Sequence, residues 1–227
     1  MNPGVKRLAY ALVIGLALAG CSHDWDPWRL LPGAGPSASI GSGAVGTCPS
    51  DMLLSPPAAG GVCVDAIEVT LDAFAKERAR VATSCEVGQV DEGMDGSLPV
   101  GFVSACEAAA YCDLGGKRTC TKAEWQQACF RTKVDPVAAC HVGQDTFVPA
   151  KSSLTCINDE GIADLIGNLW EWVCDGEFCV IVGGDASHKA SGVSALCGLI
   201  DANFGAATGE ASYVGFRCCG EPTPGAE

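Results

Sequence analysis

Cysteine is the residue that most constrains this chain, because 15 of its 227 residues are cysteines. The sequence has no Cys-x-x-Cys pair, and its one adjacent pair is Cys218-Cys219, which disfavours a zinc-binding framework. In a chain exported to an oxidising compartment, an even set of cysteines forms disulfides by default. The folds open to this chain therefore depend on whether it is exported.

Residues 1–20 have the features of a bacterial lipoprotein signal peptide. Lys6 and Arg7 give a positively charged start, and residues 8–19 form an apolar stretch that is too short for a membrane-spanning helix. We expect this segment to be removed, so that it takes no part in the fold.

The segment Leu18-Ala19-Gly20-Cys21 resembles the bacterial lipobox, in which cleavage leaves the cysteine as a lipidated N-terminus. Acyl chains such as palmitate on Cys21 then anchor the mature chain to a membrane, at about 0.8 kcal/mol for each buried CH₂ group. Ser22, rather than Asp, follows the cysteine and favours the outer membrane within the cell envelope of a Gram-negative bacterium. The alternative is an ordinary cleaved signal, which leaves Cys21 as an odd thiol.

The number of cysteines supports lipidation of Cys21. Taking the lipidated Cys21 from the 15 cysteines leaves 14, enough for up to seven disulfides. Free buried thiols are the alternative, but an exported chain would have to keep many cysteines reduced. Proximity in the sequence suggests three of the pairs: Cys48 with Cys63, Cys85 with Cys106, and Cys174 with Cys179.

Composition divides the mature chain into a linker, one domain and a tail. Residues 21–46 begin at the lipidated N-terminus and are rich in Pro, Gly, Ser and Ala, which predicts a flexible linker. Residues 221–227 predict a disordered tail, so residues 47–220 form the folded domain. The full chain has 27 acidic residues against 14 basic ones, which argues against a nucleic-acid partner, because an anionic protein repels the phosphate backbone.

Local patterns within the domain predict an α+β fold. Residues 62–70 alternate like a strand, and Thr70 caps a helix over residues 71–78. Capping boxes at Ser104-Ala-Cys-Glu107 and Thr121-Lys-Ala-Glu124 open two more helices. Glycine, asparagine and aspartate dominate after these helices, so we expect irregular strands and loops stapled by disulfides.

The segment Asp164-Leu-Ile-Gly-Asn-Leu-Trp-Glu-Trp172 concentrates chemistry in nine residues. Its two carboxylates, Asp164 and Glu171, and the carbonyl groups of the Gly167-Asn168 turn are the hard oxygen donors that calcium prefers. The alternative is a tight turn that enters a core strand, with Asp164 as a cap and Glu171 solvated. Calcium binding and simple turn formation are both open from these residues alone.

Five segments in order resemble the formylglycine-generating enzyme family, also called the sulfatase-modifying factor domain. The resemblance covers nearly the whole predicted domain and implies a loop-rich, disulfide-stapled fold related to C-type lectins. The segments are Val64-Asp-Ala-Ile-Glu-Val-Thr70, Pro99-Val-Gly-Phe-Val-Ser104 with Glu107 to Cys112, Gly116-Lys-Arg118 with Thr121 to Trp125, Asp164 to Trp172, and Gly215-Phe-Arg-Cys218.

The resemblance implies a calcium site on the fourth segment. Its ligand positions fall on the side chains of Asp164 and Glu171 and on the carbonyl groups of Gly167 and Leu169. We expect one ion rather than two, because residues 151–162 offer no match for the ligands of the family's second site.

The resemblance also implies two long-range disulfides, Cys112–Cys218 and Cys129–Cys197, which tie the helical half to the irregular half. Bridges that close long loops are the more stabilising ones in loop-closure models. These pairs leave four cysteines without an assigned partner: Cys120, Cys140, Cys156 and Cys219.

Enzymes of this family oxidise a cysteine of a client sulfatase to formylglycine, using a pair of cysteines that bind copper(I). Here the two positions fall on or beside His188 and Val193, in a loop without a thiol, so we expect no copper and no catalytic residue. We interpret His188 as a polar loop residue, and Lys117 and Arg118 as surface salt-bridge partners.

Two functional hypotheses follow from the missing thiols. The first is a non-catalytic module that binds an extracellular or periplasmic protein or glycan. The second is a formylglycine-generating oxidase that recruits other thiols, for example Cys174 and Cys179. Free thiols and bound copper(I) would distinguish the second from the first.

Overall fold

The computed structural model describes residues 46–58, 60–88, 94–189, 192–201 and 212–224, all within the unit Ser42–Glu227. The predicted signal peptide, Cys21 and nearly all of the predicted linker lie outside these residues. No helix of the described part is long and apolar enough to cross a membrane.

The first of two four-stranded sheets joins the beginning of the domain to its end. All of its neighbouring strands are antiparallel, and β8 lies between β2 and β3. In sheet order the strands are β1 (Met52–Ser55), β2 (Val62–Asp65), β8 (Cys218–Gly220) and β3 (Arg118–Thr119).

The second sheet carries the end of the segment that the sequence singled out, residues 170–172. Strand β4 begins at Trp170 and lies between β5, which is antiparallel to it, and β7, which is parallel. In sheet order the strands are β6 (Ile200–Asp201), β5 (Phe178–Val182), β4 (Trp170–Asp175) and β7 (Val214–Phe216).

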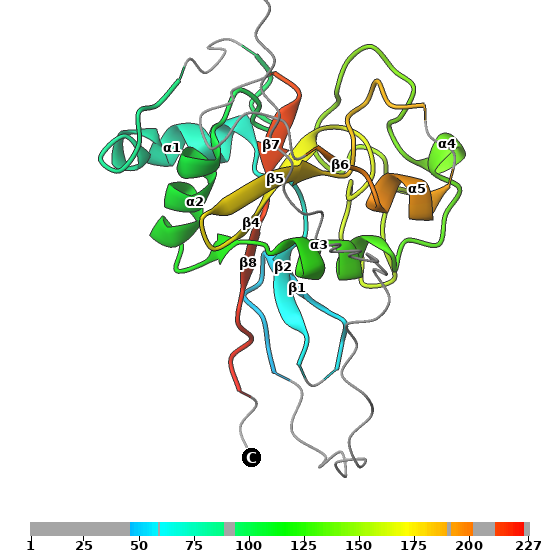
Figure 1. Ribbon diagram of the computed structural model, residues 1–227, viewed down its shortest axis with the longest axis horizontal. Helices are drawn as coiled ribbons and strands as arrows, with labels where there is room; N and C mark the ends of the chain where they lie inside the picture. Colours follow the sequence, from blue (N-terminus) through cyan, green and yellow to red (C-terminus); the bar gives the residue numbers. More distant parts are fainter. Residues whose placement is uncertain (1–45, 59, 89–93, 190–191, 202–211, 225–227) are drawn as a thin grey trace, which may run out of the picture. The chain divides into compact units, whose positions relative to one another are not determined.

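Five helices in the described residues accompany the sheets, and the first turns of the longer ones explain where they begin. Side chains of Thr70, Ser104 and Thr121 accept hydrogen bonds from backbone N–H groups three residues later, and the last two form complete capping boxes. Figure 1 shows α1 and α2 side by side, with α4 and α5 on the opposite side of the view. The helices are α1 (Leu71–Val81), α2 (Ala105–Leu114), α3 (Lys122–Cys129), α4 (Pro136–Ala139) and α5 (Val193–Cys197).

Two apolar clusters form the core. Trp125 of α3 packs in the first cluster with residues such as Ile166 and Leu196, and all three are buried. The second cluster contains Phe74 of α1 and Trp172 of β4, together with other buried side chains of α2 and β7. The candidate segment 164–172 therefore supplies side chains to both clusters.

The predicted α+β class agrees with this mixture of elements, but three boundaries differ from the predictions. Strand β2 ends at Asp65 rather than Thr70, because Val69 N–H donates to the carbonyl of Phe216 in the other sheet. Helix α1 continues to Val81. The predicted tail is ordered as far as residue 224, since Glu221 pairs with Arg118 and Thr223 bridges to Thr47.

Candidate functional site

The carboxylate of Glu171 is the centre of a buried polar cluster. Glu171 is 1% exposed, and Arg217, between β7 and β8, is 0% exposed. Arg217 donates to both Glu171 oxygens, from Nη2 to Oε1 at 2.6 Å and from Nε to Oε2 at 2.7 Å. The indole N–H of Trp125 donates to Oε2 at 2.7 Å. The expectation of a solvated Glu171, which accompanied the simple-turn alternative, is therefore wrong.

Arg217 also holds backbone that lies far away in the sequence. Its Nη2 donates to the carbonyl of Ala163 at 2.9 Å and its Nη1 to that of Asp65 at 3.2 Å. Burial opposes the charge on Arg217, but the adjacent Glu171 outweighs that effect and raises the pKa of the guanidinium. One side chain thus ties both sheets to the start of the candidate segment.

A second carboxylate, Glu68, holds the turn of the candidate segment. It is 1% exposed. Its Oε2 accepts a hydrogen bond from Asn168 Nδ2 at 2.6 Å, and its Oε1 accepts one from Leu169 N–H at 3.2 Å. Burial, followed by the nearby charges of Asp164 and Glu171, raises the pKa of Glu68 well above its ordinary value. The protein therefore confines three carboxylates with one guanidinium.

The backbone of the segment adopts conformations that few side chains accept. Asp164 and Asn168 both have φ of 56°, and Gly167 has φ of 77°. A Cβ atom on Gly167 would lie 2.3 Å from the carbonyl oxygen of His141, so only glycine fits there. Asp and Asn are among the residues that tolerate the left-handed region best, which accounts for their presence at the other two positions.

The residues that the resemblance assigns to calcium offer a partial set of free oxygens. Among the described residues, the carbonyl groups of Gly167 and Leu169 accept no hydrogen bond. Asp164 uses one oxygen, Oδ2, which accepts from Lys151 N–H at 2.6 Å. Glu171 is the least available ligand, because Arg217 and Trp125 occupy both of its oxygens.

A calcium ion at these residues would depend on main-chain oxygens as ligands. The described residues contain no group of three or more His, Cys, Asp or Glu side chains that could hold a metal. Calcium, however, takes carbonyl oxygens as readily as carboxylates. Gly167, Leu169 and Asp164 would be the principal ligands, and Glu171 could contribute only through Oε1, which has a single donor.

Seven disulfides bridge the described part of the domain. The structure joins the five pairs named from the sequence: Cys48–Cys63, Cys85–Cys106, Cys112–Cys218, Cys129–Cys197 and Cys174–Cys179. The four cysteines without an assigned partner form Cys120–Cys219 and Cys140–Cys156.

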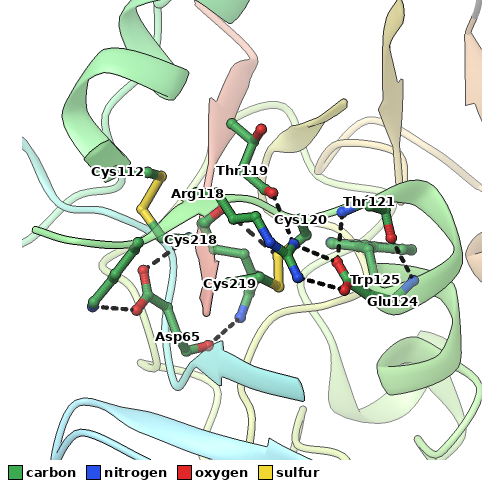
Figure 2. The surroundings of a disulfide bond; sticks show 12 residues. Asp65, Cys112, Arg118, Thr119, Cys120, Thr121, Glu124, Trp125, Cys218 and Cys219 are labelled. Carbon is green, nitrogen blue, oxygen red and sulfur yellow. Dashed lines mark hydrogen bonds and ion pairs between the residues drawn. A yellow bond between two sulfur atoms is a disulfide. The ribbon is translucent and has the colours of Figure 1, made fainter. Parts of the chain in front are cut away.

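The adjacent cysteines Cys218 and Cys219 on β8 form two of these bridges (Figure 2). One bridge leads to α2 and the other to the residue after β3. Beside them, Arg118 forms two hydrogen bonds of 2.7 Å with Glu124. Lys117 donates to Asp51 and Asp65, each at 2.6 Å. The prediction that both basic residues form salt bridges is therefore confirmed.

The loop in which the resemblance places the family's thiols begins with Asp185. His188 lies with its Nδ1 3.1 Å from Asp185 Oδ1 and its ring 4.9 Å from that of Trp170. Val193 is the first residue of α5 and packs against the first core cluster. Neither position brings a thiol to the loop.

A pocket of about 310 Å³ opens beside this loop. Its lining includes Asp185, Ala186 and Ser187 of this loop, together with residues 145–147 and Tyr213. The pocket therefore lies next to the place where the resemblance puts the active-site groove.

Glu68 and Arg217 are site residues that the sequence patterns did not predict. Both residues belong to the segments that carry the resemblance, and both interrupt apolar runs with a charge. A charged residue in such a run signals a buried partner, but the sequence alone does not identify that partner. The pairing of Arg217 with Glu171 spans 46 residues.

Known proteins resemble this chain in sequence and in fold. Formylglycine-generating enzyme from Mus musculus is 30% identical over 113 residues, which cover 37% of this chain and only 30% of the mouse protein. Among solved structures, PvdO from Pseudomonas aeruginosa has a TM-score of 0.56 at 16% identity, covering 71% of this chain and 80% of PvdO.

Two further solved structures share the fold. Treponema denticola variable protein 1 has a TM-score of 0.53 at 16% identity, covering 82% of this chain and 98% of that one. CarF has a TM-score of 0.52 at 19% identity, covering 79% of this chain and 95% of CarF. These neighbours confirm the predicted C-type-lectin-like fold. Residues 61–222 match the family described as "Sulfatase-modifying factor enzyme 1-like domain", and the chain belongs to that family.

Proposed function

We propose that this protein is an exported, lipid-anchored member of its family that binds a ligand and has no oxidase activity. The observation that carries the proposal is the state of the cysteines. The 14 cysteines of the domain form seven disulfides. The positions that the resemblance assigns to the family's thiols fall on or beside His188 and Val193. Binding copper(I) for oxidation needs soft thiolate ligands, and none remains here.

The alternative oxidase hypothesis depended on Cys174 and Cys179. These residues lie opposite one another on β4 and β5 and are bonded to each other. They would have to be reduced before they could bind copper(I), and no further cysteine of the described domain could replace them.

Loops around the pocket supply the binding surface in this proposal. They are fixed to a rigid scaffold, an arrangement that suits recognition of a protein or glycan outside the cytoplasm. The lipid on Cys21 would hold the domain at the outer membrane of the cell envelope, at the end of the linker formed by residues 21–46.

One calcium ion completes the proposal. It would bind the carbonyl groups of Gly167 and Leu169 and the carboxylate of Asp164, with Glu171 contributing through Oε1. When bound, the ion would neutralise charge in a cluster that holds three carboxylates and one guanidinium, and would fix the turn that Glu68 supports.

Peptide mapping of the mature protein tests the proposal. The native protein is alkylated without reductant, digested and analysed by mass spectrometry, which reads lipidation of Cys21, disulfide partners and free thiols together. We expect a lipidated Cys21 and no alkylated cysteine between residues 48 and 219. In parallel, a cysteine peptide from a sulfatase is incubated with the copper-loaded protein. Conversion to formylglycine, or a stoichiometric pair of free thiols, would establish the oxidase instead.

A further inference from the structure

The pocket beside Asp185 has a chemical character that none of the family motifs explains. Two carboxylates, Asp145 and Asp185, contribute to its lining together with the aromatic side chains of Phe147 and Tyr213 and the thioether of Met94. None of the described residues that line it is Lys, Arg or His. The pocket therefore combines negative charge with apolar walls.

Asp185 is the most enclosed of these groups. It is 8% exposed, and its Oδ1 accepts from the N–H and Oγ of Ser187 at 2.9 and 2.6 Å and faces His188. Its Oδ2 accepts no hydrogen bond from any described residue. Every fully buried side-chain oxygen in the described part of the chain has a partner. Asp185 lines the pocket, where Oδ2, unpaired among the described residues, could accept a hydrogen bond from a ligand.

Hydrogen bonds from backbone N–H groups hold the residues on either side of 145–147, which line the pocket. Gln144 N–H donates to the carbonyl of Ala186 at 2.7 Å, and Gly143 N–H donates to that of His188 at 2.9 Å. Val148 N–H donates to Asn168 Oδ1 at 2.9 Å. A pocket held in this way loses little freedom on binding, so it can recognise a small group with useful affinity.

We propose that this pocket binds the ammonium or guanidinium group of a Lys or Arg side chain on a polypeptide partner. This inference rests on the proposed binding function. A carboxylate beside aromatic faces attracts a cation through charge-assisted hydrogen bonds and cation–π contacts. A volume of about 310 Å³ is at the small end for ligand pockets and suits one side chain. The net charge of −13 would steer a basic polypeptide toward the domain.

Matched peptides test the inference by calorimetry at low salt. The probes are acetyl-Gly-Lys-Gly-amide and acetyl-Gly-Arg-Gly-amide, with norleucine and citrulline peptides as neutral counterparts. We expect the basic peptides to bind saturably and at least tenfold more tightly than the neutral ones, with affinity falling as salt rises. Equal binding of charged and neutral peptides, or no binding of either, would overturn the proposal.

Three variants locate the interaction. Asp185→Asn is expected to weaken binding of the Arg peptide at least tenfold. Asp113→Asn, which removes the same charge from an exposed position on α2, should leave binding unchanged. Because Asp185 also orders its own loop, Phe147→Leu gives a second measure, and we expect a loss of three- to tenfold. If Asp113→Asn weakens binding as much as Asp185→Asn does, the attraction is nonspecific and the pocket is not the site.

Two outcomes separate this inference from related ideas. Butylamine that binds as tightly as the Lys peptide would identify a free amine as the ligand and overturn the polypeptide assignment. Failure of all the probes in a protein without free thiols or oxidase activity would overturn the cation pocket and leave the proposed function standing.

Discussion

At the scale of single residues, the buried ion pair of Arg217 and Glu171 is the place where loss of one charge should lower the stability most. Removal of one partner from a buried ion pair leaves the other as an uncompensated buried charge, at a cost of about 3–5 kcal/mol. We therefore expect Arg217→Met to lower the free energy of unfolding by that amount. Urea titration followed by tryptophan fluorescence measures the change.

Arg118 provides the matched control for Arg217. Its side chain is 38% exposed where it pairs with Glu124, so Arg118→Met should cost less than about 1 kcal/mol. The double variant Glu171→Gln with Arg217→Met should recover part of the loss, because it removes both buried charges. Equal losses for Arg217→Met and Arg118→Met would contradict the assigned role of the buried pair.

Glu124 should make stability depend on pH. Burial opposes its ionisation, but hydrogen bonds from Arg118 and Thr121 outweigh this effect and lower the pKa of Glu124 below 4.5. A carboxyl group with a lowered pKa in the folded state adds stability above its unfolded pKa and loses it as pH falls through the folded pKa. Between about pH 6 and pH 3, the wild type should therefore lose more stability than Glu124→Gln.

Glutamine preserves the capping box in that variant, so the comparison isolates the charge of Glu124. The difference should stay below about 1 kcal/mol, since the ion pair is partly exposed. Urea midpoints measured at several pH values test this expectation. Parallel curves for the two proteins would show that Glu124 contributes nothing to the acid sensitivity.

At the scale of elements, local chemistry could be predicted from the sequence and long-range pairing could not. The capping boxes at Ser104 and Thr121 were predictable because donor and acceptor are three residues apart. Strand β3 has two residues and β8 has three, too few for a periodicity to be recognised. Strand β8 pairs with β2 on one side and β3 on the other. Both short strands therefore depend on partners that are distant in the sequence.

Two nested disulfides give a test at this scale. Cys112–Cys218 closes 106 residues and Cys120–Cys219 closes 99, but the two bridges share nearly the same ends. While one is intact, the other closes an effective loop of only about ten residues. Loop-closure entropy then predicts a loss of about 3 kcal/mol for either bridge alone.

Removal of both bridges releases the whole loop and should cost roughly 2 kcal/mol more than the sum of the single losses. The variants replace each pair of cysteines by alanine, and guanidinium unfolding measures their stabilities. Replacement of Cys174 and Cys179, which are five residues apart and close no shared loop, is the control and should be additive with either bridge. Strict additivity of the nested pair would contradict the shared-loop explanation.

At the scale of the whole molecule, the candidate site depends on residues that only the fold assembles. The sequence identified the ligand segment through its carboxylates and its glycine. It could not identify Glu68, which is 100 residues from Asn168, or the guanidinium of Arg217 beside Glu171. The charge balance of the site is known only once the fold shows that the carboxylates of Glu68, Asp164 and Glu171 lie near the guanidinium of Arg217.

Calcium should therefore stabilise the whole domain, since the ion would bind a turn that both sheets support. At calcium concentrations about 100-fold above the dissociation constant, binding adds about 2.7 kcal/mol to the stability. For a domain of this size, that corresponds to a rise of about 5–10 °C in Tm relative to protein dialysed against EDTA. Magnesium should have a smaller effect, because it demands a stricter octahedral geometry.

Asp164→Asn should reduce the calcium-dependent rise in Tm, whereas Asp159→Asn, which removes a charge paired with Arg131 and Lys133, should preserve it. Identical Tm values in calcium and EDTA would contradict calcium binding at this turn.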